Sequence, residues 1–134
     1  MRPFSLEPRM LTLGGVFYPT GYVVVMVPTP QDAHQLEQAL NAGGFQDEEP
    51  MLLDPDTILQ VLGHTVRNDT NPLPSVGTEG ATIHEYERLA RDGHHAVMIH
   101  APNKKDSDHV MEAVHTVPFS FAQKYRLLVI EDMS

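Results

Sequence analysis

Residues 22–45 read YVVVMVPTPQDAHQLEQALNAGGF, and residues 96–119 read AVMIHAPNKKDSDHVMEAVHTVPF. The second segment aligns with the first without a gap, from residue 22 to residue 96, an offset of 74 residues. Identical residues fall at five pairs of positions: Val23 and Val97, Pro28 and Pro102, Asp32 and Asp106, Ala39 and Ala113, Phe45 and Phe119. Each copy has the pattern of an apolar strand, a proline-marked turn and an amphipathic helix. The repeat predicts two similar β-α-β units in one chain.

Helix start and stop signals support this interpretation. In the first copy Thr29 is the expected N-cap, Pro30 the first helical residue, and Gly43 with Gly44 the stop. In the second copy Asn103 is the expected N-cap, and Pro118 ends the helix. Residues 22–27 and 95–101 read as strands buried on both faces, and 51–53 and 125–130 as further short strands. We therefore expect an α+β, ferredoxin-like sandwich with helices on one face of a four-stranded sheet.

Two segments lie outside the repeat. Residues 1–20 are rich in proline and predict an irregular arm, so the single domain is expected to span residues 21–134. A helical insert at about residues 54–93 separates the two units. We expect one helix from Pro55 to about Val66 and a second from Thr82, where Thr82 and Glu85 form a capping box, to Gly93. The loop between them is long enough to suggest a function.

Composition excludes several function classes. The 134 residues contain no cysteine, which removes disulfides and thiolate metal sites. The formal net charge is −9, and nucleic-acid binding needs clustered basic residues, so neither nucleic acid nor an anionic membrane is an expected partner. The sequence has no His-x-x-x-His spacing, and we expect no metal and no cofactor. No apolar run is long enough for a signal peptide or a membrane span, which predicts a cytoplasmic protein.

The first candidate site is an anion site at the start of the second-copy helix, at Asn103, Lys104 and Lys105. Free amides and the positive end of a helix attract phosphate or carboxylate, and the two lysines add charge. Asp106 and Asp108 follow immediately and compete for the same helix end. Ordinary helix capping is therefore the alternative interpretation.

The second candidate site is the loop of the insert with its flanks, where Ser75, Glu79 and His84 stand near His64. A Ser, a His and an acid suggest nucleophilic catalysis, but triads are recognised by geometry, and Gly-x-Ser-x-Gly is absent. The same segment can bind a ligand, or pack over the sheet or against a partner. Catalysis is the weakest of these interpretations, and we expect no enzyme.

The sheet face without helices needs a cover. The insert, the arm, or the same face of a second subunit in a twofold dimer can supply it. The residues expected together on one face, and at the seam if a dimer forms there, are Tyr22, Val24, Met26, Met98 and His100. In that case Met26→Asp would dissociate the dimer.

The segments Gly21–Met26, Gly43–Phe45 and Gly93–Pro102 together resemble the small bacterial heat-induced general stress protein domain. The resemblance covers roughly residues 20–130 and implies a β-α-β pair split by an insert, a bacterial stress-associated setting and no established catalytic residue. The leading expectation is a small non-enzymatic protein that acts through protein contacts or as a homodimer. The alternative is a sensor or regulatory module with a small ligand at the sheet face or dimer seam.

Overall fold

The computed structural model describes residues 1–6, 10, 19–46, 49–67, 78–125 and 130–133, and of residues 63–67, 78–82 and 130–132 it describes the backbone alone. The strands in the described part are β1 (Arg2–Pro3), β2 (Tyr22–Val27), β3 (Met51–Leu53), β4 (His95–His100), β5 (Phe121–Tyr125) and β6 (Ile130–Asp132). The helices there are α1 (Pro30–Ala42), α2 (Pro55–Arg67), α3 (Thr78–Arg91) and α4 (Lys104–Val114). The α+β class is confirmed.

The strands form one mixed sheet in the order β1-β3-β4-β2-β5-β6. β1 pairs with β3 in parallel, and every other described pair is antiparallel. At the centre of the sheet β2 and β4, the strands of the two sequence copies, pair from Tyr22 with His100 to Val27 with His95. The repeated segments are therefore neighbours in space.

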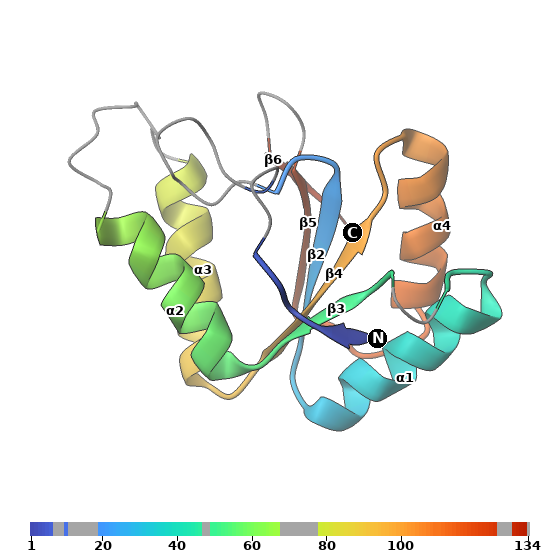
Figure 1. Ribbon diagram of the computed structural model, residues 1–134, viewed down its shortest axis with the longest axis horizontal. Coiled ribbons are helices and arrows are strands. Elements are labelled where there is room, and N and C mark those ends of the chain that lie inside the picture. The colour runs from blue at the N-terminus through green and yellow to red at the C-terminus, as the bar shows by residue number, and fades with distance from the viewer. Residues whose placement is uncertain (7–9, 11–18, 47–48, 68–77, 126–129, 134) are drawn as a thin grey trace.

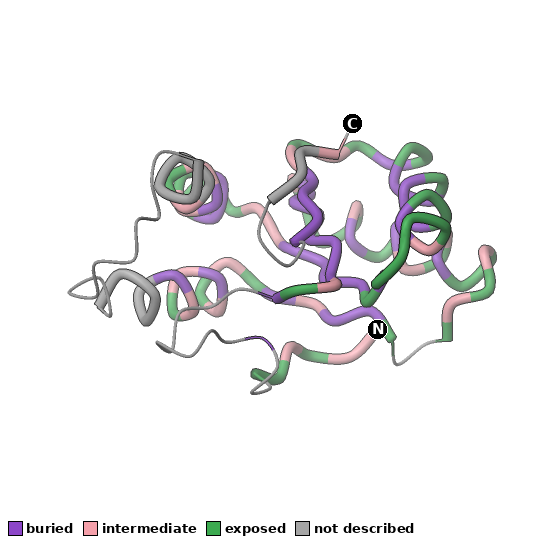
Figure 2. Tube along the Cα trace, turned by 90° about the horizontal axis from the view of Figure 1, so that it is seen from above, coloured by how far each residue is buried: buried purple, intermediate pink, exposed green. Residues whose placement is uncertain are grey.

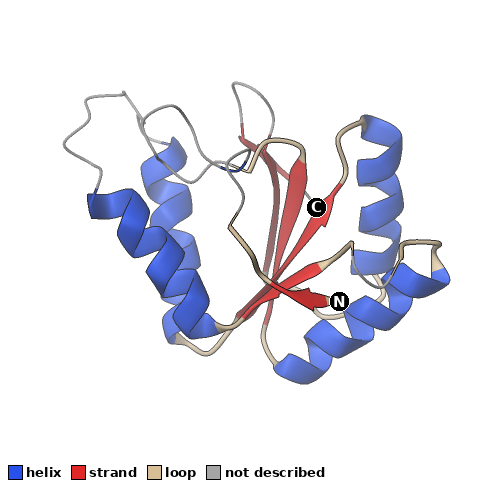
Figure 3. Ribbon diagram, viewed as in Figure 1, coloured by secondary structure: helices blue, strands red, loops and turns tan. Residues whose placement is uncertain are grey.

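Helices cover both faces of the sheet (Figures 1 and 3). α1 and α4 lie on one face, where Val23, Val25, Val97 and Ile99 pack against Leu36, Leu40, Val110 and Val114. α2 and α3 lie on the other, where Val24, Met26, Ala96 and Met98 pack against Ile58, Leu62, Tyr86 and Leu89. Figure 2 shows the buried strands between these two helix layers. Alternation along β2 and β4 supplies both cores, because successive side chains point to opposite faces.

The two sequence copies use the same capping device. The Thr29 hydroxyl accepts a hydrogen bond from the Asp32 backbone N–H at 3.1 Å, and Asn103 Oδ1 accepts one from the Asp106 N–H at 2.8 Å. A third helix, α2, is capped by Asp54, whose Oδ1 accepts the Thr57 N–H at 2.8 Å. The bonds from the Thr57 backbone and side chain lower the pKa of Asp54. The expected caps of α1 and α4 are confirmed.

Three expectations about the elements are wrong. The second insert helix begins at Thr78, not at Thr82, so Thr82 is an internal helical residue and the capping box does not form; Glu85 instead binds Arg88 at 2.6 Å. The strand after α4 begins at residue 121 and not at residue 125: β5 runs over residues 121–125 beside β2, and β6 is a separate antiparallel strand. Residues 126–129 of the expected strand lie outside the described residues.

The third wrong expectation is that residues 1–20 form an irregular arm. Within these residues β1 joins the sheet, because the Arg2 N–H and the Phe4 N–H donate to the carbonyl oxygens of Pro50 and Leu52. Met10 is fully buried in the core between the sheet and α2–α3. The extended piece expected at residues 11–13 lies outside the described residues.

Candidate functional site

The face expected to meet a second subunit is covered within the single chain. Tyr22, Val24, Met26 and Met98 do share one face, as expected, and they are at most 6% exposed beneath α2, α3 and Met10. The insert and the arm therefore provide the cover. These four side chains have no surface left for a second copy of the chain, which corrects their placement at a dimer seam. His100, the fifth residue of that set, is exposed.

The anion site expected at the start of α4 is occupied by the helix itself. Asn103 Oδ1 caps the Asp106 N–H, and the Lys104 ammonium pairs with Asp108 at 3.0 Å along the exposed side of the helix. Lys104 and Lys105 line a shallow depression of about 570 Å³ on the outer side of α4, together with Asp108, His109 and Glu112. All five belong to one helix, so this depression has a single wall. The arrangement favours ordinary capping.

The candidate residues of the insert are not brought together with that helix. Ser75 lies outside the described residues, and so does the side chain of Glu79, whose backbone is in the first turn of α3. His84 is exposed on α3, on the opposite side of the sheet from α4. In the described part of the chain these residues form no joint site.

A groove of about 560 Å³ does gather side chains from separate segments, and we call it the β4–α4 groove. Its lining comes from β1, the start of β2, the connection between α1 and β3, the end of β4 and the first turn of α4: Arg2, Tyr22, Phe45, Gln46, Glu49, His100, Pro102 and Asp106. Such a convergence of polar and aromatic side chains is typical of small-molecule sites.

Backbone geometry holds the groove in place. Gly21, at φ +84°, immediately precedes Tyr22, and its carbonyl oxygen accepts the Ala101 N–H at 2.8 Å. A Cβ at Gly21 would lie 3.7 Å from His100 Nε2. This left-handed conformation suits glycine and allows the β2 start to lie against the β4 end.

Aromatic contacts fix two of the groove walls. The rings of Tyr22 and His100 lie 5.0 Å apart, and the ring of Phe45 lies 5.2 Å from that of His109 on α4. Both distances fall in the range of favourable aromatic pairs. Phe45 is thereby held between α1 and α4, with one side toward the groove.

A buried polar clamp supports the turn that carries the groove. The Lys124 ammonium donates to Ser107 Oγ at 2.5 Å, and both residues are at most 5% exposed. Ser107 Oγ lies 3.0 Å from the Asn103 carbonyl oxygen and 3.3 Å from that of Ala101. His100, Pro102 and Asp106 are each adjacent in sequence to a residue of this clamp. β5 therefore fixes the β4–α4 turn from beneath.

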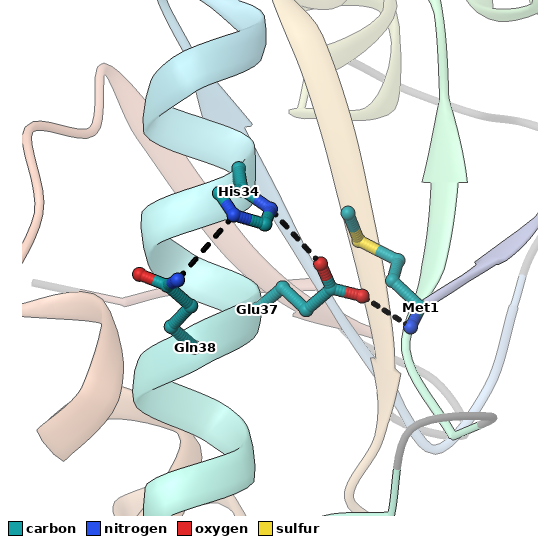
Figure 4. Close-up of polar contacts among 4 residues, drawn as sticks. All are labelled: Met1, His34, Glu37 and Gln38. Carbon is teal, nitrogen blue, oxygen red and sulfur yellow. Dashed lines mark hydrogen bonds and ion pairs between the residues drawn. The ribbon is translucent and has the colours of Figure 1, made fainter.

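A histidine and a carboxylate do meet elsewhere, on α1. His34 Nδ1 lies 3.2 Å from Glu37 Oε1, Gln38 contacts the other ring nitrogen, and the Met1 ammonium pairs with Glu37 Oε2 (Figure 4). The bond from the Met1 ammonium is the main cause that lowers the pKa of Glu37. His34 is 65% exposed, so this network lies on an open helix surface and not in a cleft.

No cluster of three metal-ligating side chains occurs among the described residues. None of the helices in that part of the chain is both long and apolar enough to cross a membrane.

Comparison with known proteins found no match to this chain among family models, curated proteins or solved structures.

Sequence reasoning missed most of the groove. The sequence singles out Tyr22 and His100, but for a dimer seam, and Glu49 belongs to no site predicted from the sequence. Phe45 carried a signal, because it ends the first repeat and matches Phe119. The convergence itself depends on β1 joining β3, which no local pattern predicts.

Proposed function

We propose that this chain is a small non-enzymatic binding module whose ligand is a small molecule held in the β4–α4 groove. The observation that carries the proposal is the convergence of eight lining residues from four separate stretches of the chain. The lining combines aromatic rings with charged and amide side chains, and such a combination orients a small ligand. Of the two non-enzymatic functions expected from the sequence, ligand binding has the better support.

The geometry of the titratable groups supports a binding role over catalysis. General acid–base chemistry needs a donor and an acceptor within hydrogen-bond reach of a bound substrate. In the described part of the chain, the contact between a histidine and a carboxylate lies on the open surface of α1, while His100 in the groove contacts the ring of Tyr22.

We also propose a ferredoxin-like description for the four central strands. The order β3-β4-β2-β5, with all neighbours antiparallel and with α1 and α4 on one face, supports it. β1 and β6 extend that sheet at its edges, and the insert helices cover its second face. In this description β2-α1-β3 and β4-α4-β5 are the two halves that the repeat encodes.

Homodimerisation and a bacterial stress-associated setting, which come from the packing argument and the resemblance, are separate proposals. A dimer would have to use another surface than the face now beneath α2 and α3. Native mass spectrometry reads the subunit number directly: a dimeric mass would support the first of these proposals, and a monomeric mass would contradict it.

The groove is tested with three probes that share a phenyl ring and differ in charge: benzylammonium, benzyl alcohol and phenylacetate. Amide chemical shifts are followed during titration of the whole protein. We expect saturable shifts around Tyr22, Phe45 and His100 with one or more of the probes. Phe45→Ala should weaken binding of all of them, while the matched surface variant His84→Ala should not.

Two outcomes would contradict the proposed function. One is the absence of saturable shifts with any of the three probes at millimolar concentration. The other is saturable binding that maps to another surface and is unaffected by Phe45→Ala in a variant whose circular dichroism shows a folded protein.

A further inference from the structure

The lining of the β4–α4 groove contains two carboxylates and one cation. Glu49 is exposed, Asp106 is half-buried, and neither carboxylate has an ion-pair partner among the residues that the structure describes. The groove has one cation, Arg2, which makes an interaction within the chain. Two carboxylates against one guanidinium give the lining of the groove a negative formal charge.

The helix end beside the groove does not reverse this sign. A helix N-terminus attracts anions through its free N–H groups and its positive dipole end. In α4 the Asp106 N–H is taken by Asn103 Oδ1, and the Asp106 carboxylate itself lies in the first turn. Lys104 is paired with Asp108, and Lys105 lines the depression on the outer side of the helix. An anion in the groove would meet two carboxylates and one guanidinium, that of Arg2.

An aromatic ring of the groove suits a cation as well. Phe45 is a half-buried aromatic wall, and a cation placed over the face of such a ring is attracted by its quadrupole. The net charge of −9 also raises the local concentration of cations around the protein.

From these observations we propose that the ligand of the β4–α4 groove is a small organic cation, a primary ammonium or a guanidinium on an apolar body. Glu49 and Asp106 bind the charged group, and Phe45 contacts the apolar body. This inference rests on the proposed function and names the chemical class of its ligand.

The three phenyl probes separate the inference from the proposed function. We expect benzylammonium to bind about fivefold more tightly than benzyl alcohol, since one exposed and one half-buried carboxylate contribute modestly each, and phenylacetate to bind most weakly. Raising the salt concentration should weaken benzylammonium and leave benzyl alcohol unchanged.

Isosteric variants test whether Glu49 and Asp106 cause the preference for benzylammonium over benzyl alcohol. In the double variant Glu49→Gln and Asp106→Asn, benzylammonium should bind no better than benzyl alcohol does. The affinity for benzyl alcohol should be unchanged in that variant, which shows that the groove is still folded. Asp108→Asn, on the same helix but outside the groove, is the matched control and should keep the preference for the cation.

Each contrary result has a distinct meaning. Tightest binding of phenylacetate in the groove would overturn the inference and leave the proposed function standing. A preference for benzylammonium that survives the double variant would overturn the roles of Glu49 and Asp106. Binding of none of the three probes would overturn the proposed function itself.

Discussion

The buried pair of Lys124 and Ser107 gives an asymmetric prediction for two substitutions. Ser107→Ala removes the described partner of the Lys124 ammonium and leaves that charge buried. A hydrogen bond to a charged group contributes about 1.5–3 kcal/mol, so we expect the free energy of unfolding to fall by about 2 kcal/mol. Lys124→Met removes the buried charge itself, and Ser107 keeps its bonds to the Asn103 and Ala101 carbonyl oxygens. We expect that variant to be as stable as the natural chain or more stable.

The sequence repeat gives a reason to expect that the fold tolerates the loss of both Ser107 and Lys124. At the offset of 74 residues, Ser107 corresponds to Ala33, which is 1% exposed at the same position of α1. The first copy thus packs this position without a polar pair. The double variant Ser107→Ala and Lys124→Met should therefore lie within about 0.5 kcal/mol of Lys124→Met alone, which gives a coupling energy of about 2 kcal/mol.

Urea denaturation of the natural chain, the two single variants and the double variant measures this coupling energy. With a slope of about 2 kcal/mol per molar urea, Ser107→Ala should lower the midpoint by about 1 M, and Lys124→Met should not lower it. Two results would refute the reasoning that an unpaired buried ammonium destabilises Ser107→Ala. One is a fall of less than about 0.5 kcal/mol in the free energy of unfolding of Ser107→Ala, and the other is a double variant as unstable as Ser107→Ala.

Further predictions concern the ion pair on α1, the helix caps and the buried sheet face. The Met1 ammonium holds the pKa of Glu37 below its ordinary value of 4.5, so the stability that Glu37 adds is present above that pH and is lost as pH falls through the lowered pKa. Glu37→Gln should therefore lower the urea midpoint at neutral pH and make no difference in strong acid; an equal effect at both would contradict the assignment. Asn103→Ala and Thr29→Ala should each cost about 1 kcal/mol in urea denaturation, because each removes an N-cap, and no loss in either would show that its cap bond does not stabilise the helix. Met26→Asp should unfold the chain and not merely dissociate it, because the side chain is fully buried beneath the insert helices; a folded variant by circular dichroism would show that this face is not buried as described.

The parts of the fold that rest on local signals were predictable. The N-caps at Thr29 and Asn103, the strand at residues 22–27 and the insert helix from Pro55 each depend on a few neighbouring residues. The repeat adds a check, because the same devices appear twice at one offset. Alternation in the two central strands correctly divided their side chains between two faces.

The errors fall where long-range pairing decides. β5 includes residues 121–124 because they pair with β2, and the Gly21 N–H donates to the Tyr125 carbonyl oxygen at 2.8 Å. The apolar run expected at residues 125–130 gives no sign that the strand begins at residue 121. α3 begins at Thr78, one turn before the cap expected at Thr82, although Gly80 in that turn disfavours helix.

The candidate site was the least predictable part. Arg2, Glu49 and Asp106 belong to an arm, a turn and a helix end, and each has an ordinary local explanation. Their meeting follows from the parallel pairing of β1 with β3 and from the position of β4 beside both β3 and β2. Sequence spacing carries no information on such a convergence, because the residues are tens of positions apart.

The most direct test of the central claim is a crystal structure of the protein with benzylammonium. The account predicts the phenyl ring in the β4–α4 groove against Phe45, with the ammonium within about 4 Å of a carboxylate oxygen of Glu49 or Asp106. Benzylammonium bound on another surface, or in the groove with its ammonium turned away from both carboxylates, would contradict it.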